Sequence, residues 1–319
     1  MSQLTAVRTA SRTAIGAQWW HLSTQAGGFD VADGIIGDLV TPLAAQAQVL
    51  RAGRWFYSRC MEPSAVQVRL HILAQPGTIE RLQTFHQALV KRSNLDLASL
   101  PSHQHCSPPA GSGYYLRGME DSDPQLEAEL FKYGGVEGLQ LAEEVFELSS
   151  ELAAWGTQRF AKMHNRSAFA SLILFDSARS MMKGPRSASW PDRRRISWDY
   201  YWDSHLKTCT PDLGPRGASV REAMMTQVNA KVPGFHGLMS ATAAESAVHN
   251  WRRRWFRALD TYLYRADKAR VSRSAQHLTV HQAHMTLNRL GFTPREEAVL
   301  GLYARTWTVD RERTLFNRN

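Results

Sequence analysis

Apolar and polar residues alternate with a period of two in one short stretch of the chain, residues 66–72. Successive side chains of a strand point to opposite faces, so this stretch predicts a strand with one aliphatic and one polar face. The polar face carries Arg69 and His71, about 6 to 7 Å apart by strand geometry. With the aromatic stretch before it, the segment predicts a hairpin over residues 53–73. The alternative is an ordinary amphipathic strand whose polar face is only solvated.

Most of the remaining chain has the helical period instead. Helices are predicted over residues 30–50, 76–89, 137–148, 151–180, 198–205, 219–230, 240–266 and 281–290, with one more after Thr293. Two further strands are expected, residues 17–22 as an edge strand or its approach and residues 114–117 within a long irregular loop. This order predicts an α+β fold, a mixed β-sheet with helices packed on it and a helix-rich C-terminal half.

Glycines and prolines separate these elements, but none of these breaks indicates a boundary between two domains. A single domain over residues 1–319 is therefore expected. Glycines, prolines and three consecutive arginines predict a mobile loop at 183–197. Gly291 predicts a helix end. Thr293, Pro294 and Glu296 predict the capped start of the next helix.

Composition narrows the class of protein. The 43% hydrophobic content suffices for a packed core, and the net charge of +9 implies an anionic partner. The three cysteines are widely spaced and form no C-x-x-C pair, which favours a reducing, cytoplasmic location. No secretion signal and no apolar run of membrane-spanning length is present, so no membrane association is predicted.

Several short motifs resemble known chemical sites but lack the residues that would complete them. The histidines and cysteine of residues 103–106, and the histidines at 277, 281 and 284, lack completing ligands at usual spacing, so no metal is predicted. Residues 180–183 match S-x-x-K without its companion motifs. Neither a dinucleotide fingerprint nor a P-loop is present. The arginine triplets at 193–195 and 252–254 match no nucleic-acid-binding fold, and a solvated helix face explains the second equally well.

Three spaced motifs carry a resemblance. Residues 55–59 read Trp-Phe-Tyr-Ser-Arg and are followed by Glu-Pro and by Val-Arg-Leu-His at 68–71; residues 132–135 read Lys-Tyr-Gly-Gly; residues 284–291 read His-Met-Thr-Leu-Asn-Arg-Leu-Gly. In this order they resemble the C-terminal elimination domain of lantibiotic dehydratases, from about Trp19 to the C-terminus. With no large glutamylating domain in front, the chain is most similar to the thiopeptide members, the pyridine synthases.

The resemblance implies an enzyme that needs no cofactor and forms a macrocycle. Two dehydroalanines of a precursor peptide are joined by a formal four-plus-two aza-cycloaddition, and water and the leader peptide are lost. The implied partner is a precursor with an acidic leader and a core bearing dehydroalanines and azoles. No nucleic-acid partner is expected, and a homodimer is left open.

The departures from the family pattern matter for this choice. His71 and Lys132 stand where the elimination enzymes carry arginines, which are expected to hold the departing glutamate. Imidazole and ammonium lack the two parallel donors of guanidinium, so elimination is disfavoured. The alternatives are a stand-alone glutamyl lyase that forms dehydroalanine and a non-catalytic protein that binds the leader or a nucleic acid.

The resemblance also implies candidate site residues. His284 is expected to act as an acid/base, oriented by Asn288 or by backbone, while Arg69 with His71 polarises an amide carbonyl. Tyr200 and Tyr201 are expected to donate protons or to stack on azole rings, with simple packing as the alternative. The expected substrate-binding residues are Arg59, Lys132, Tyr133, Trp202 and Asn288.

Overall fold

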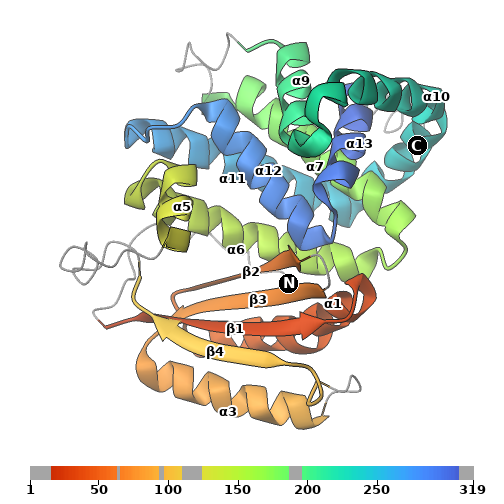
Figure 1. The fold of residues 1–319 in the computed structure, drawn as a ribbon. Coiled ribbons are helices and arrows are strands. Elements are labelled where there is room, and N and C mark those ends of the chain that lie inside the picture. Colours follow the sequence, from red (N-terminus) through yellow and green to blue (C-terminus); the bar gives the residue numbers. More distant parts are fainter. Residues whose placement is uncertain (1–15, 63–64, 93–96, 110–123, 187–195, 309–319) are drawn as a thin grey trace. The chain divides into compact units, whose positions relative to one another are not determined.

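The computed structural model describes residues 16–62, 65–92, 97–109, 124–186 and 196–308 (Figure 1). The chain forms two compact units, Met1–Met119 and Glu120–Asn319. The first contains the sheet and is called the sheet unit; the second is called the helical unit. The predicted strand at 114–117 and most of the predicted loop, residues 187–195, lie outside the described residues.

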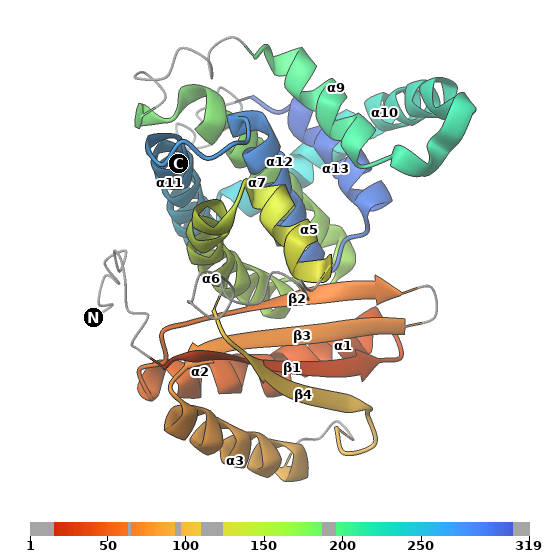
Figure 2. The same cartoon turned by 60° about the vertical axis from the view of Figure 1, so that its left-hand side comes forward.

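The sheet unit is built on four strands, β1 (Gln18–Ala26), β2 (Arg54–Glu62), β3 (Ala65–Ala74) and β4 (Ser102–Ser107). Their order is β2-β3-β1-β4, as Figure 2 shows. Every pairing is antiparallel. The hairpin of β2 and β3 and the α+β class are therefore confirmed, whereas the sheet is antiparallel rather than mixed.

Two strand predictions were wrong. β1 was expected at an edge but lies between β3 and β4. β4 was expected to be loop, because its sequence Ser-His-Gln-His-Cys-Ser offers no aliphatic residue to alternate with polar ones. It is an edge strand that pairs only with β1, so it forms without an apolar face of its own.

One face of the sheet packs against helices α1 (Phe29–Ile35), α2 (Thr41–Val49) and α3 (Pro76–Arg92), with a π-helical turn at Ile36–Val40 between the first two. On this face Leu70 and Ile72 are fully buried, and Trp20 meets His86 of α3 edge-on with ring centroids 6.3 Å apart. The predicted aliphatic face of β3 is thereby confirmed. Arg69 and His71 share the opposite face.

The helical unit is formed from helices only, within the described residues. They are α5 (Pro124–Tyr133), α6 (Val136–Arg159), α7 (Met163–Lys183), α9 (Trp198–Thr208), a 3-10 segment (Pro211–Arg216), α10 (Gly217–Ala243), α11 (Ser246–Lys268), α12 (Ala275–Leu290) and α13 (Pro294–Arg305). The expected helix over 151–180 is in fact two helices. The expected helix over 219–230 continues through Pro233 to Ala243.

The connection between α12 and α13 follows its sequence signals. Gly291 adopts φ 92°, a left-handed conformation that glycine takes at little cost and that ends α12. Thr293 and Glu296 form the predicted capping box at the start of α13. This turn sets the two helices so that Glu297 of α13 meets His284 of α12.

Among the described residues, none of the helices is both long and apolar enough to cross a membrane.

Candidate functional site

The sheet face opposite α1, α2 and α3 carries one row of rings across all four strands. Phe56, His71, His21 and His105 are direct neighbours in the strand register. Phe56 stacks on His71 and His105 stacks on His21, with ring centroids 4.7 and 4.5 Å apart. Because each residue comes from a different strand, this row is a product of the register and not of any one motif.

His21 is the centre of this row. Its Nδ1 lies 2.7 Å from Nδ1 of His71, and its Nε2 lies 2.7 Å from Oγ of Ser107. Burial, followed by the positive charge that His105 can carry, lowers the pKa of His21 to about 4. No described carboxylate hydrogen bonds to the ring, and with this lowered pKa His21 is neutral at pH 7 and hydrogen bonds to His71 as an uncharged ring.

The two sheet arginines lie on opposite faces. Arg69 shares the face of His71, as predicted, and its Nε donates to Oε1 of Gln67 at 2.6 Å. Arg59 is on the helix-covered face, 2% exposed, with an ion pair of 2.7 Å to Asp33 of α1. The structure does not bring Arg59 together with Arg69, and the contacts of Arg59 hold α1 to the sheet. Its substrate-binding role stays a prediction.

In the helical unit, the Lys-Tyr-Gly-Gly motif ends α5. Gly134 adopts φ 77°, and a side chain there would press against Val271. The turn leaves Lys132 half-exposed, its Nζ 2.6 Å from Oε1 of Glu129, while Tyr133 is fully buried. Burial is the main reason that the pKa of Tyr133 lies well above its usual range. Tyr133 is therefore neutral and buried, and its substrate-binding role stays a prediction.

Three histidines of α12 lie beside this motif. Nε2 of His277 contacts the backbone oxygen of Lys132 at 2.9 Å, and the ring of His281 lies edge-on to Tyr133 with centroids 5.2 Å apart. Burial, then the neighbouring His284, lowers the pKa of His281 to about 4. His281 is thus neutral at pH 7 and available as a proton acceptor.

His284 has the opposite electrostatic setting. Its Nδ1 is 2.6 Å from Oε2 of Glu297, a carboxylate that is 1% exposed, while the His284 side chain is 35% exposed. Burial alone would lower the pKa of His284, but the hydrogen bond and charge of Glu297 outweigh it and raise the pKa. Glu297 therefore holds the ring through Nδ1, a partner that was not predicted, and the orienting role of Asn288 or backbone stays a prediction.

Glu297 binds a second histidine from another helix. Its Oε1 is 3.1 Å from Nε2 of His205 on α9. Burial would raise the pKa of Glu297, but the hydrogen bonds from His205 and His284 lower it to about 2. The carboxylate is therefore ionised at every physiological pH and fixes both rings.

The closest approach of α9 to α13 depends on Gly301. A Cβ at this position would lie 2.7 Å from the His205 ring. Sγ of Cys209 lies 3.7 Å from Nε2 of His205, and burial is the main cause that raises the pKa of the Cys209 thiol. His205, Cys209 and Glu297 offer three donor atoms within 4.8 Å of one another, enough to be considered for a metal. Hydrogen bonds among them account for the same arrangement, and we assign no ion to it.

The aromatic residues predicted on α9 are divided between surface and core. Tyr200 is 61% exposed, whereas Tyr201 and Trp202 are buried. Trp202 meets the rings of Tyr201 and His205 edge-on. The packing alternative fits Tyr201 and Trp202, and only Tyr200 presents a ring at the surface. Asn288 lies one turn beyond His284 on α12 and is half-buried.

Three residues that matter were missed from the sequence: His21, His205 and Glu297. His21 stands in a strand whose register was unknown. Glu297 follows the capping glutamate and looks like another acidic residue of a first helical turn. A signal was present, since Glu297 and Gly301 share a helix face, and a glycine inside a helix indicates close packing on that face.

Comparison with solved structures identifies the fold. The chain is similar to TsrL (TM-score 0.59, 15% identity, covering 94% of this chain and 96% of that one). It is also similar to the pyridine synthase TbtD from thiomuracin biosynthesis (TM-score 0.56, 17% identity, 95% and 100% covered). A third similar structure is the tRNA-dependent lantibiotic dehydratase MibB from Microbispora sp. 107891 (TM-score 0.53, 18% identity). There the match covers 97% of this chain but 29% of the other.

Comparison with curated proteins gives no match. The sequence family described as the C-terminal part of lantibiotic biosynthesis dehydratase, in contrast, matches residues 19–307 and so spans both units. The chain therefore belongs to the lantibiotic dehydratase C-terminal family.

Proposed function

We propose that this protein is a pyridine synthase that closes a thiopeptide macrocycle. The reaction joins two dehydroalanines of a precursor peptide. The amide before one of them tautomerises to an imidic acid, which creates a 2-azadiene, and the second dehydroalanine adds across it. Loss of water and of the leader as a carboxamide leaves an aromatic pyridine. Each step requires positioning and proton transfer.

One observation carries this proposal. His281 and His284 are neighbours on α12, with ring centroids 6.4 Å apart, and their pKa values are displaced in opposite directions. A pair of titratable groups pushed apart in this way supplies a base and an acid at the same pH. Tautomerisation needs both, since the amide nitrogen loses a proton and the amide oxygen gains one.

The roles follow from these protonation states. Neutral His281 accepts the amide proton, and protonated His284 donates to the oxygen. His284 then takes up a proton from solvent, to which its side chain is 35% exposed, and donates it to the departing hydroxyl as water forms. Glu297 is a positioning residue: it raises the pKa of His284 and holds Nδ1, so the ring's Nε2 is the nitrogen left for the substrate. Within the described residues, Nε2 of His284 makes no other hydrogen bond.

His71 of the sheet unit and Lys132 of the helical unit support cyclisation over glutamate elimination on separate grounds. His71 is held by His21 at 2.7 Å and stacked on Phe56, and Lys132 is paired with Glu129. Neither presents the two parallel donors that bind a carboxylate bidentately. Arg69 with His71 is proposed to polarise a peptide carbonyl instead, a task that single donors perform.

Mass spectrometry tests the proposal directly. The substrate is a synthetic precursor with an acidic leader, two dehydroalanines and an azole-bearing core. Loss of leader carboxamide plus water marks the cyclase. Loss of glutamate from a glutamylated peptide marks the lyase, and an unchanged mass marks a binding protein; either result would overturn the proposal.

Two variants test the assignment of the acid and the base. His281→Ala and His284→Ala should each lower turnover by about 10²–10⁴-fold, the usual contribution of a positioned acid or base. His249→Ala is the control, because His249 is an exposed histidine of α11 in the same unit. Tyr200→Phe and Tyr201→Phe ask whether either hydroxyl donates a proton. Unchanged turnover in both α12 variants would remove these histidines from the mechanism.

A further inference from the structure

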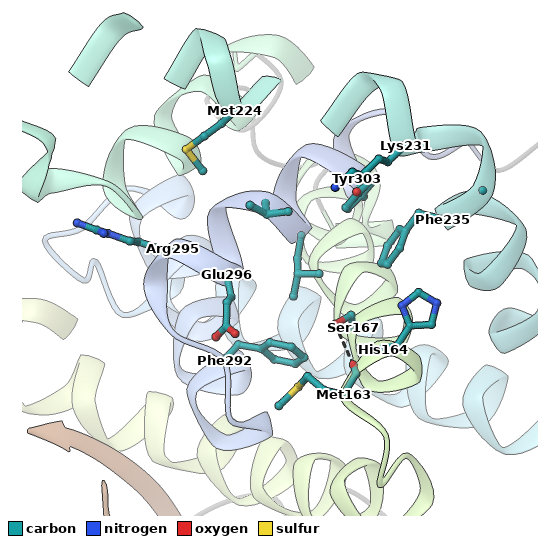
Figure 3. A pocket seen from close by; sticks show the side chains of 13 residues that line it. Met163, His164, Ser167, Met224, Lys231, Phe235, Phe292, Arg295, Glu296 and Tyr303 are labelled. Atoms are coloured by element: carbon teal, nitrogen blue, oxygen red, sulfur yellow. Dashed lines mark hydrogen bonds between the residues drawn. The ribbon is translucent and has the colours of Figure 1, made fainter. Parts of the chain in front are cut away.

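The helical unit contains a cavity of about 740 Å³, lined by α7, α10, α13 and the turn before α13 (Figure 3). Arg295, Val299 and Tyr303 face it from α13, spaced four residues apart along one side of the helix. Glu297 and Gly301 lie on a different side and contact His205. The cavity is therefore separate from the histidine site.

Its lining is apolar and adaptable. Phe235 and Tyr303 stack with centroids 4.0 Å apart, and Phe292 contributes a third ring. Met163 and Met224 stand on opposite walls in Figure 3. Methionine is flexible and polarisable and is common on surfaces that bind peptide side chains of varied shape. The volume falls within the range of typical ligand sites.

The polar groups of this cavity are predominantly cationic. Lys231 makes no hydrogen bond or ion pair with any described residue, and the ring of His164 lies edge-on to that of Phe235 with centroids 6.3 Å apart. Arg295 pairs with Asp212, both exposed, at 2.5 Å. The acid of the lining, Glu296, is held by Thr293 in the capping box. The free polar groups thus favour an anionic ligand.

We propose that this cavity captures the acidic leader of the precursor peptide, by taking up an apolar side chain of the leader while Lys231 and His164 meet its carboxylates. A groove between helices with apolar walls is a known mode of binding an amphipathic peptide. The net charge of +9 steers an acidic peptide toward the protein. The inference rests on the proposed function, because that function supplies the leader.

The chain offers a way to fill the cavity without disturbing the fold. Gly234 of α10 lines it, and a Cβ added there meets no atom within 4 Å. Gly237, three residues later on the same helix, is equally open but does not line the cavity. Gly234→Trp and Gly237→Trp therefore form a matched pair, one blocking the cavity and one not.

The experiment measures fluorescence anisotropy of the labelled leader segment alone, without the core. Gly234→Trp should weaken binding at least tenfold, and Gly237→Trp should leave it unchanged. Lys231→Glu should weaken binding and flatten its dependence on salt, whereas Lys207→Glu, an exposed position on α9, should do neither. Circular dichroism checks that each variant is folded.

The outcomes separate this inference from the proposed function. If wild-type protein fails to bind the leader, or Gly234→Trp binds it normally, the inference is overturned even where cyclisation proceeds. If Gly234→Trp loses binding but the substrate never changes mass, the leader site stands and the cyclase assignment fails.

Discussion

Two clusters of histidines in this protein have opposite electrostatic settings. In the sheet unit, His21 hydrogen bonds to His71 and Ser107, and its pKa is lowered to about 4. In the helical unit, His284 hydrogen bonds to Glu297, and its pKa is raised. Burial disfavours the charged ring in both places. The difference is a buried carboxylate, which outweighs burial in one cluster and is absent, among the described residues, from the contacts of His21.

The comparison shows that the partner of a histidine, and not its exposure, decides what it can do. His21 is a neutral support that holds His71 in place. His284, whose pKa is raised by Glu297, keeps its proton to a higher pH than His21 does. His281 shows the same rule inside the helical unit, because it lies beside His284 but has no carboxylate of its own and stays neutral.

Removing the carboxylate of Glu297 should leave His284, like His21, without a negatively charged partner. This change should have the largest effect on turnover. Glu297→Gln keeps the shape of the side chain but not its charge, so burial should lower the pKa of His284 below its ordinary value. Turnover at pH 7 should fall about 10²–10⁴-fold as the acid is lost. NMR titration of His284 together with kinetics measures both changes.

A neighbouring glutamate supplies the control for this variant. Glu296→Gln changes the capping residue next to Glu297, which does not contact His284, and should leave the pKa of His284 in place. If Glu297→Gln lost activity while His284 still titrated above its ordinary value, the carboxylate would act on the reaction by another route.

Adding a carboxylate to the histidine cluster of the sheet unit should give His21 an electrostatic setting like that of His284. His71→Glu places a carboxylate beside His21, and the pKa of His21 should rise from about 4 toward its ordinary value or above it. Turnover should fall about 10²-fold, since an acceptor replaces a donor at the carbonyl. His71→Gln separates the two effects, because it changes activity without adding charge. If His21 still titrated near pH 4 in His71→Glu, the conclusion that the partner of a buried histidine sets its pKa would be refuted.

Local sequence signals predicted the parts of these clusters that depend on neighbours in the chain. The alternation of residues 66–72 placed Arg69 with His71, and the capping box at Thr293 fixed the start of α13. Arg59 lies with Trp55 and Tyr57 on the buried face of β2, and the sequence did not indicate this because residues 55–57 are three consecutive aromatics. β4 was not readable, since it has no apolar period and forms only by pairing with β1.

The partners of the histidines could not be predicted for a physical reason. His21 meets His71 across 50 residues of sequence, and His205 meets Glu297 across 92. Such contacts are set by strand register and helix packing, which no local pattern encodes. An acidic residue in a first helical turn is usually solvated and complements the helix dipole, so the burial of Glu297 runs against its local preference.

The packing of α9 on α13 can be tested through Gly301. Gly301→Ala places a Cβ 2.7 Å from the His205 ring, so helix and ring must move apart. Overpacking costs about 1–3 kcal/mol, offset by up to about 1 kcal/mol from the better helix propensity of alanine. Denaturant unfolding should show a net loss. Gly237→Ala, which meets open space, should be stabilised instead, and equal behaviour of the two variants would show that the contact is not tight.

The smallest expected effect is a difference in how stability depends on pH. The pKa of His21 is depressed in the folded state, so its contribution is fully present above its ordinary pKa of 6.5 and is lost as pH falls toward about 4. His284 has a raised pKa, so its contribution is present below 6.5 and is lost as pH rises through the folded value. His21→Gln should therefore make the rise in unfolding free energy between pH 4 and 6.5 shallower, by at most about 1.4 kcal/mol per pH unit. His249→Gln should leave that slope unchanged. His284→Gln should act only on the alkaline side, because His284 binds its proton more tightly in the folded state whereas His21 binds its proton more tightly in the unfolded state.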